Sequence, residues 1–200
     1  MKAKSPPPQL VLCATTWSMI GWPTPRREWS AAQKLRAIRT AGFDGVCAFI
    51  TPELKALADD LGLRLMSGFD AKSVADAVPL LIAQRDLGVR FINIQLLNHD
   101  TLPATAARVA VQLIRESRKL GVSVHIETHR DTSTETPEKF DEIARRYRRA
   151  TGELLPVTWD HSHFAVSKHM LPADYSARLL VWPKLIQHSQ MFHLRPFNSQ

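Results

Sequence analysis

The 200-residue sequence contains only two cysteines, Cys13 and Cys47, and no apolar run approaches the roughly 18 residues that a membrane helix needs. Its 8 glycines and 13 prolines exclude a collagen and a low-complexity chain, and its 44% hydrophobic residues exclude an intrinsically disordered one. Each cysteine lies inside a short apolar segment, so we expect two small buried thiols in a reducing compartment. The sequence therefore predicts a cytoplasmic globular protein that does not associate with membranes.

The length favours a single domain over residues 10–200, preceded by a flexible N-terminal tail at residues 1–9. The formal net charge is +7, but the lysines and arginines are spread over many segments. The densest cluster is typical of the solvated face of one helix, and it comprises Arg145, Arg146, Arg148 and Arg149. We interpret the basic balance as a generic surface property and do not expect a nucleic-acid partner.

A glycine repeatedly separates the end of an amphipathic segment from the start of an apolar one. This pattern occurs at Gly42, Gly62, Gly88, Gly121 and Gly152. Glycine at a helix C-terminus adopts a left-handed conformation without a Cβ clash, so each position predicts the end of a helix and a return to the sheet. Apolar residues recur at helical spacing in the segments 28–41, 72–87, 104–120 and 137–150, and a further helix is expected within 172–190.

The apolar segments predict seven short strands buried on both faces, at about 10–16, 45–50, 63–69, 90–97, 122–128, 155–160 and 190–195. Regular alternation of strands and helices is typical of a (β/α)8 barrel or a doubly wound sheet. The sequence has no Gly-x-Gly-x-x-Gly after the first strand, so the dinucleotide-binding version has no support. We therefore predict an α/β chain of the (β/α)8 TIM-barrel type, truncated after strand 7 and lacking the final β/α unit.

Carboxylates and imidazoles concentrate where the last three predicted strands end. Glu127, Asp160 and His193 each lie at or near such an end. The carboxyl ends of barrel strands converge on one mouth, so these side chains are expected to meet there. Two carboxylates and an imidazole suit Mn²⁺, Mg²⁺, Co²⁺ or Zn²⁺, and the sequence predicts a site for one such ion.

Several other residues are candidates for the same mouth. His163 follows Asp160 by three residues on the predicted loop, and His188 is a rival to His193 as the third ligand. His99 could line the site or lie on a solvated loop, and Trp17 could stack on a sugar or simply pack at the rim. By strand alternation His125, Glu127 and His129 share one face while the strand lasts, so both histidines could add substrate contacts.

Three segments together resemble the xylose isomerase-like barrels, which comprise sugar and sugar-phosphate isomerases and epimerases, with endonuclease IV as a relative. The segments are Val124-His125-Ile126-Glu127, Thr158-Trp159-Asp160-His161-Ser162-His163 and Phe192-His193-Leu194-Arg195. The resemblance implies that Glu127, Asp160 and His193 bind one divalent metal ion, together with an acid from strand 8. It also implies that His163 and, at a less typical spacing, Arg195 contact the substrate.

The reaction implied by this resemblance is proton transfer next to the carbonyl of a small sugar or sugar phosphate. The metal would polarise the sugar oxygens and stabilise an enediolate, while Glu127 would serve as both ligand and base. The seven predicted strands do not include the strand 8 acid, so an inactive barrel, or one completed by another subunit of a homo-oligomer, stays open. The alternatives are an endonuclease IV-like phosphodiesterase acting on abasic DNA and a non-catalytic metal- or sugar-binding remnant.

Overall fold

The computed structural model describes residues 9–196, which divide into two compact units at the boundary between Met66 and Ser67. The first unit contains the parallel strands β1 (Cys13–Thr15) and β2 (Gly45–Cys47) and the beginning of β3 (Arg64–Ala71). Two 3-10 turns, η1 (Trp17–Met19) and η2 (Pro25–Arg27), precede helix α1 (Ala31–Thr40), and α2 (Pro52–Asp60) connects β2 to β3.

The helices of the first unit begin at residues whose side chains satisfy exposed backbone amides. Ser30 forms a capping box with Gln33 at the start of α1, and Thr51 accepts a hydrogen bond from the amide of Leu54 at the start of α2. Leu35 and Ile38 of α1 are buried, as is Val46 of β2, so these side chains belong to the core of this unit.

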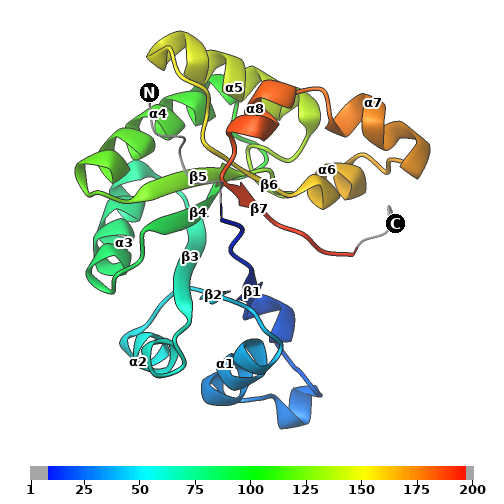
Figure 1. The fold of residues 1–200 in the computed structure, drawn as a ribbon. Helices are drawn as coiled ribbons and strands as arrows, with labels where there is room; N and C mark the ends of the chain where they lie inside the picture. Colours follow the sequence, from blue (N-terminus) through cyan, green and yellow to red (C-terminus); the bar gives the residue numbers. More distant parts are fainter. Residues whose placement is uncertain (1–8, 197–200) are drawn as a thin grey trace, which may run out of the picture. The chain divides into compact units, whose positions relative to one another are not determined.

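The second unit contains the end of β3 and the strands β4 (Phe91–Leu96), β5 (Ser123–Glu127), β6 (Val157–Trp159) and β7 (Met191–Phe192), all parallel and paired in chain order. Helices α3 (Val74–Asp86), α4 (Pro103–Lys119) and α5 (Pro137–Thr151) connect successive strands and lie along the same side of β3, β4 and β5 (Figure 1). Between β6 and β7 lie α6 (His161–Ser167), η3 (Pro172–Asp174), α7 (Tyr175–Leu179) and α8 (Pro183–His188).

The predicted fold class is confirmed. Seven parallel strands follow one another in chain order with helices between them, which matches a TIM-type barrel up to its seventh strand. The glycines that predicted the ends of helices have φ angles between +63° and +89°, which L-residues rarely adopt; they are Gly42, Gly62, Gly88, Gly121 and Gly152. Each of them turns the chain from a helix toward the next strand, which explains why the pattern predicted the strands.

An aromatic cluster supports the strand that precedes Asp160. Trp159 of β6 is 1% exposed, and its ring centroid lies 5.0 Å from that of Phe140 of α5 and 5.8 Å from that of Trp182. Trp182 is held in turn by a 2.8 Å hydrogen bond from its indole nitrogen to Asp141 Oδ1. This packing fixes the end of β6, and with it the backbone that carries Asp160.

Two sequence-based predictions about the segment after β6 are wrong. The single helix expected within 172–190 is instead η3, α7 and α8. Pro183 lacks an amide hydrogen and disfavours a helical conformation at Trp182, so the chain stops and starts a new helix there. The loop expected to carry His163 is the first turn of α6, because Asp160 caps a helix that begins at His161.

The sequence also led to predictions about the two cysteines, the N-terminal tail and membrane-spanning helices. Neither Cys13 nor Cys47 forms a disulfide, and Cys47 is buried whereas Cys13 is half-buried. Residues 1–8 of the predicted tail lie outside the described residues, and the single-domain organisation stays a prediction. Within residues 9–196 no helix has the length and apolar character needed to cross a bilayer.

Candidate metal centre

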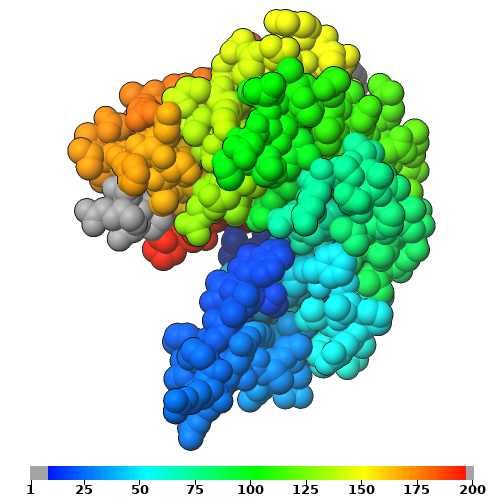
Figure 2. All heavy atoms as spheres, turned by 180° about the vertical axis from the view of Figure 1, so that it is seen from behind, coloured from blue at the N-terminus to red at the C-terminus, as the bar shows by residue number. Residues whose placement is uncertain are grey.

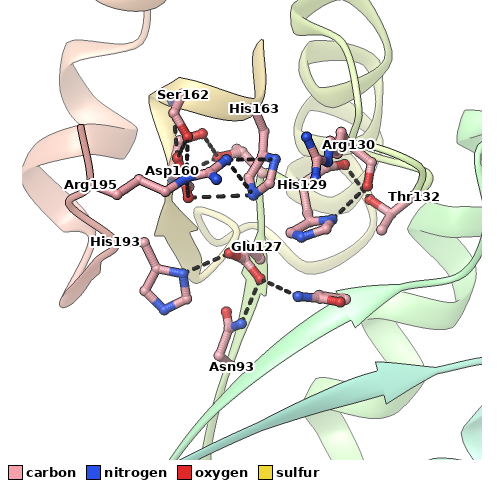
Figure 3. Close-up of polar contacts among 12 residues, drawn as sticks. Asn93, Glu127, His129, Arg130, Thr132, Asp160, Ser162, His163, His193 and Arg195 are labelled. Carbon is pink, nitrogen blue, oxygen red and sulfur yellow. Dashed lines mark hydrogen bonds and ion pairs between the residues drawn. The ribbon is translucent and has the colours of Figure 1, made fainter. Parts of the chain in front are cut away.

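Glu127, Asp160 and His193 meet where three consecutive strands end. Glu127 is the last residue of β5, Asp160 follows β6, and His193 follows β7 (Figure 3). One ligand atom from each residue lies within 4.8 Å of the other two. Both carboxylates are nearly inaccessible to solvent, with 2% exposure for Glu127 and 3% for Asp160. The three side chains that the strand ends predicted are therefore brought together in the second unit.

The Glu127 carboxylate is held by side chains from two other strands. Asn93 of β4 donates a 2.6 Å hydrogen bond from Nδ2 to Glu127 Oε2, and Gln95 donates a 3.2 Å bond to the same oxygen. His193 Nδ1 lies 2.6 Å from the other oxygen, Oε1, and donates to it because a carboxylate can only accept. Every contact comes from an element distant in the sequence, and together they fix both oxygens.

The Asp160 carboxylate is held mainly by its own helix. Its Oδ1 accepts a 3.0 Å hydrogen bond from the amide of Ser162 and a second bond from the Ser162 hydroxyl. These contacts make Asp160 the N-cap of α6. The backbone on either side is tied to the residue that follows β5, because Thr128 Oγ1 accepts from the Asp160 amide at 2.9 Å and donates to the Asp160 carbonyl at 3.0 Å.

Arg195 connects Asp160 to His163. Its Nε donates a 2.7 Å hydrogen bond to Ser162 Oγ and lies 3.4 Å from Asp160 Oδ2, while its terminal nitrogen lies 3.2 Å from His163 Nδ1. His163 Nε2 is also 3.4 Å from Asp160 Oδ2. The two residues that the family resemblance implied as substrate contacts thus border the carboxylates.

The pKa values of this cluster reflect burial set against hydrogen bonding. Burial raises the pKa of Glu127, but the hydrogen bond and charge of His193 lower it more, and the result is a pKa of about 2. Burial alone would lower the pKa of His193, yet the hydrogen bond to Glu127 raises it. Burial and the neighbouring His129 lower the pKa of His163 to about 4. At neutral pH, Glu127 is therefore an ionised carboxylate and His163 is neutral.

His129 completes a second group with Glu127 and His163, whose ligand atoms also lie within 4.8 Å of one another. The His129 and His163 rings are 3.8 Å apart between centroids. His129 Nδ1 donates a 2.5 Å hydrogen bond to the carbonyl of Arg130, which leaves its Nε2 as the nitrogen with a lone pair in the neutral ring. β5 ends at Glu127, so His129 reaches this position from the following loop and not from the strand.

Other residues named from the sequence are not part of either group. His125 is buried, lies 2.9 Å from Ser123 Oγ through its Nε2, and has a pKa lowered by burial to about 4. His99 is exposed and lies 3.5 Å from an Asp100 oxygen, and His188 ends α8. Among the described residues only His193, and not its rival His188, groups with both carboxylates. Trp17 belongs to η1 in the first unit, and its role as a substrate contact stays a prediction.

Sequence reasoning missed the side chains that hold the carboxylates, namely Asn93, Gln95 and Ser162. Asn93 and Gln95 are two residues apart in an otherwise apolar strand, so alternation alone places both on one face of β4. A pair of amides at that spacing in a buried strand was the available signal. Ser162 could have been recognised as the second residue after a helix-capping Asp.

A cavity of about 530 Å³ in the second unit lies next to these residues. Its lining includes Gln95 and His129, which border Glu127, and it extends to polar side chains at the ends of β3, β4 and β5, among them Asp70, Lys72, Asn98 and Arg130. The volume is in the range of small-molecule sites. Acidic, basic and neutral polar side chains line it and offer both hydrogen-bond donors and acceptors, which suits a small hydroxylated molecule.

The donor set fits a divalent cation. The two carboxylates are hard ligands and the imidazole is a ligand of intermediate softness. Their ligand atoms are close enough to share one ion. His193 Nε2 is buried and has no hydrogen-bond partner among the described residues, so this ring still has a nitrogen to offer.

Comparison with solved structures identifies the fold. A xylose isomerase-like TIM-barrel protein from Mycobacterium smegmatis in complex with magnesium aligns with a TM-score of 0.67 at 16% identity, over 92% of this chain and 74% of that one. The chain has the xylose isomerase-like TIM-barrel fold. The probable 3-DHS dehydratase AsbF of Bacillus anthracis aligns with a TM-score of 0.65 at 15% identity, over 92% of this chain and 73% of that one.

A D-psicose 3-epimerase from Clostridium cellulolyticum H10, solved with D-tagatose, has the same fold. It aligns with a TM-score of 0.51 at 16% identity, over 68% of this chain, and the alignment spans only 60% of the epimerase. No protein-family model matches the sequence, and no curated protein matches it either. The xylose isomerase-like fold that the three sequence segments indicated is therefore confirmed, whereas the activity has to be argued from the site.

Proposed function

We propose that this chain is a divalent-metal-dependent isomerase or epimerase that moves a proton on the carbon next to the carbonyl of a small sugar or sugar phosphate. The observation that carries this proposal is the convergence of Glu127, Asp160 and His193 from three consecutive strand ends, with ligand atoms within 4.8 Å. The sugar-epimerase and magnesium-bound neighbours of the same fold support it.

Glu127, Asp160 and His193 would hold the cation. When bound there, a divalent cation supplies positive charge that polarises the carbonyl and hydroxyl oxygens of a substrate. The fourth ligand implied by the resemblance, an acid from strand 8, is not among the seven strands of the described residues. The proposed centre therefore has three protein ligands among the described residues. The alternative of a metal- or sugar-binding protein without turnover is an outcome of the test below.

The amides of Asn93 and Gln95 give Glu127 one fixed orientation. Both donate to Oε2, so the carboxylate cannot rotate without losing two hydrogen bonds in a buried site. An ionised carboxylate in a fixed position is suited to accept a proton from carbon, because orientation compensates for modest basicity. We assign Glu127 the role of ligand and proton acceptor on this basis.

Arg195 and His163 would bind the oxygens of the substrate. The Arg195 side chain is 42% exposed although it touches buried Asp160, so its donors can reach both the carboxylate and a bound molecule. His163 is neutral at physiological pH and can donate or accept a hydrogen bond. The cavity beside Gln95 and His129 would take the remainder of the sugar, and contacts from His99 or Trp17 stay predictions.

No observation on the described residues supports the alternative of a phosphodiesterase. The end of β3 carries Asp70 and no histidine, and the neighbours named above are not nucleases. The cytoplasmic location and a homo-oligomeric state are not needed for the proposal and stay predictions.

Hydrogen exchange at carbon tests the proposed reaction without knowledge of the product. The protein is incubated in D₂O with Mn²⁺ and a panel of ketoses, aldoses and their phosphates, and deuterium at the carbon next to the carbonyl is followed by NMR. We expect incorporation into at least one sugar and its loss in Glu127→Gln. Metal binding without exchange on any sugar of the panel would contradict the enzymatic proposal and leave a binding protein.

A further inference from the structure

A basic groove runs between α4 and α5 on the outer side of the second unit. Its volume is about 480 Å³, and Figure 2 shows α4 in green beside α5 in yellow. It is lined by Ala104, Ala107, Arg108, Val111, Gln112, Arg115, Arg146, Arg149 and Ala150. The lining residues include four arginines and no acid. None of them belongs to the candidate metal centre, so the groove is a separate feature of this chain.

The arginines of α4 form one edge of the groove at regular spacing. Arg108 and Arg115 are seven residues apart, which is two helical turns and about 10.5 Å along the axis. Arg146 and Arg149 of α5 form the other edge, three residues apart and therefore on one face of that helix. The residues between these edges are small or apolar, among them Ala107 and Val111.

Most of this charge is not neutralised within the protein. Arg115 and Arg149 have no ion pair or side-chain hydrogen bond in the described part of the chain, and Arg108 donates only to the Thr105 hydroxyl, at 3.2 Å. Arg146 alone has an acidic partner, Glu142 at 2.6 Å. Elsewhere on the same helices Arg145 and Arg118 are paired, with Asp141 at 2.8 Å and with Glu153, whereas Arg148 has no such partner among the described residues. Three of the four groove arginines therefore present positive charge without an acidic partner in the described part of the chain.

The shape and chemistry of the groove fit an acidic amphipathic helix. The alanines that line the groove allow another helix to approach closely, and the apolar stripe of that helix would cover Val111. Carboxylates seven residues apart on such a helix repeat at the same distance as Arg108 and Arg115 when the two helices lie side by side. No aromatic side chain lines the groove to stack on bases, which disfavours single-stranded nucleic acid.

We propose that the groove between α4 and α5 binds an acidic amphipathic helix of a partner protein, with Arg108, Arg115, Arg146 and Arg149 pairing with its carboxylates. The N-terminal segment of this chain is excluded as the occupant on charge, because residues 1–9 contain Lys2 and Lys4 and no acid. The interaction is independent of the proposed enzymatic function.

The test uses a synthetic helical peptide with glutamates seven residues apart along each edge of an alanine and leucine stripe. Binding to the full chain is measured by calorimetry at two salt concentrations. We expect a dissociation constant that rises at least about tenfold in Arg115→Glu/Arg149→Glu and that also rises with salt, because exposed charges are screened. The matched control, Arg26→Glu/Arg36→Glu, makes the same charge change at exposed arginines of the first unit and should bind the peptide like wild type.

Three outcomes would overturn the proposal. One is equal binding of a peptide in which every glutamate is glutamine, since this would remove the role of charge. Another is an equal loss in the control variant, since this would reduce the effect to net charge. The third is tighter binding of a single-stranded oligonucleotide of the same charge, since the groove would then be a phosphate-binding surface. Circular dichroism of both variants checks that these exposed substitutions leave the fold intact.

Discussion

The two carboxylates of the candidate metal centre are held in opposite ways. Glu127 is fixed by Asn93, Gln95 and His193, which lie 34, 32 and 66 residues away in the sequence. Asp160 is fixed chiefly by Ser162, two residues further along. The orientation of Glu127 therefore depends on the register of β4 and on the pairing of β7 with β6, which places His193. The orientation of Asp160 depends on one turn of helix. Disturbing the sheet should affect Glu127 first.

The largest expected effect concerns Glu127 and the stability of the protein in acid. The pKa of Glu127 is lowered to about 2 from an ordinary value of 4.5, because the hydrogen bond and charge of His193 outweigh the effect of burial. Its contribution is thus complete above pH 4.5 and is lost as the pH falls toward 2. We expect a loss of about 3 kcal/mol in the free energy of unfolding over this range, measured by urea denaturation.

Glu127→Gln should lack most of this acid-dependent loss, whereas Glu53→Gln, at an exposed position of α2, should retain it. Parallel pH profiles for wild type and Glu127→Gln would show that the hydrogen bonds to Glu127 do not stabilise the fold.

The next largest effect is expected at the amides of β4. Asn93→Leu removes a 2.6 Å hydrogen bond to a buried carboxylate and should lower the free energy of unfolding by about 2–3 kcal/mol. Gln95→Leu removes a 3.2 Å bond at a half-buried position and should cost about 1 kcal/mol or less. Equal costs in urea denaturation would mean that the two amides do not differ in how they hold Glu127.

A smaller effect is expected on the Asp160 side. Ser162→Ala removes the hydroxyl bonds to Asp160 and Arg195 but keeps the backbone amide that donates to the capping Asp160 carboxylate, so the cost should be about 1 kcal/mol. The acid-dependent loss attributed to Glu127 should be unchanged in this variant. A changed acid profile in Ser162→Ala would show that the two carboxylates are not supported separately.

The smallest effect is expected for Arg195→Ala. The arginine side chain is 42% exposed and its distance to Asp160 is 3.4 Å, so the loss of stability should stay below about 1 kcal/mol. The substitution should weaken substrate binding more than stability, so that half-maximal hydrogen exchange requires a higher sugar concentration than in the wild type. A stability loss larger than that of Asn93→Leu would assign Arg195 a structural role instead.

The same contrast explains what the sequence could predict. Glu127, Asp160 and His193 were predicted because each lies at a strand end, and strand ends were marked by local features such as the glycines after helices. The amide spacing places Asn93 and Gln95 on one face of β4, but they were missed because their partner Glu127 is brought to them only by the long-range pairing of β4 with β5. His163 was predicted beside Asp160, but its helix was not, since seven residues are too few for a clear periodicity.

The segment between β6 and β7 was the least predictable part of the fold. Its elements are only three to seven residues long, and Pro172 and Pro183 start new turns within it. Such short helices are determined by packing, here of Trp182 against Trp159 and Phe140, and not by propensity. The regular helices α3, α4 and α5 were instead predicted to within about three residues, because their apolar faces repeat over several turns.

Equilibrium dialysis against Mn²⁺ tests directly whether Glu127, Asp160 and His193 form one cation site. We expect about one bound ion per wild-type chain and a marked loss of binding in Glu127→Gln, Asp160→Asn and His193→Gln. His188→Gln, which changes a histidine outside the cluster, should bind like wild type. Equal Mn²⁺ binding by wild type and the three site variants would contradict the claim.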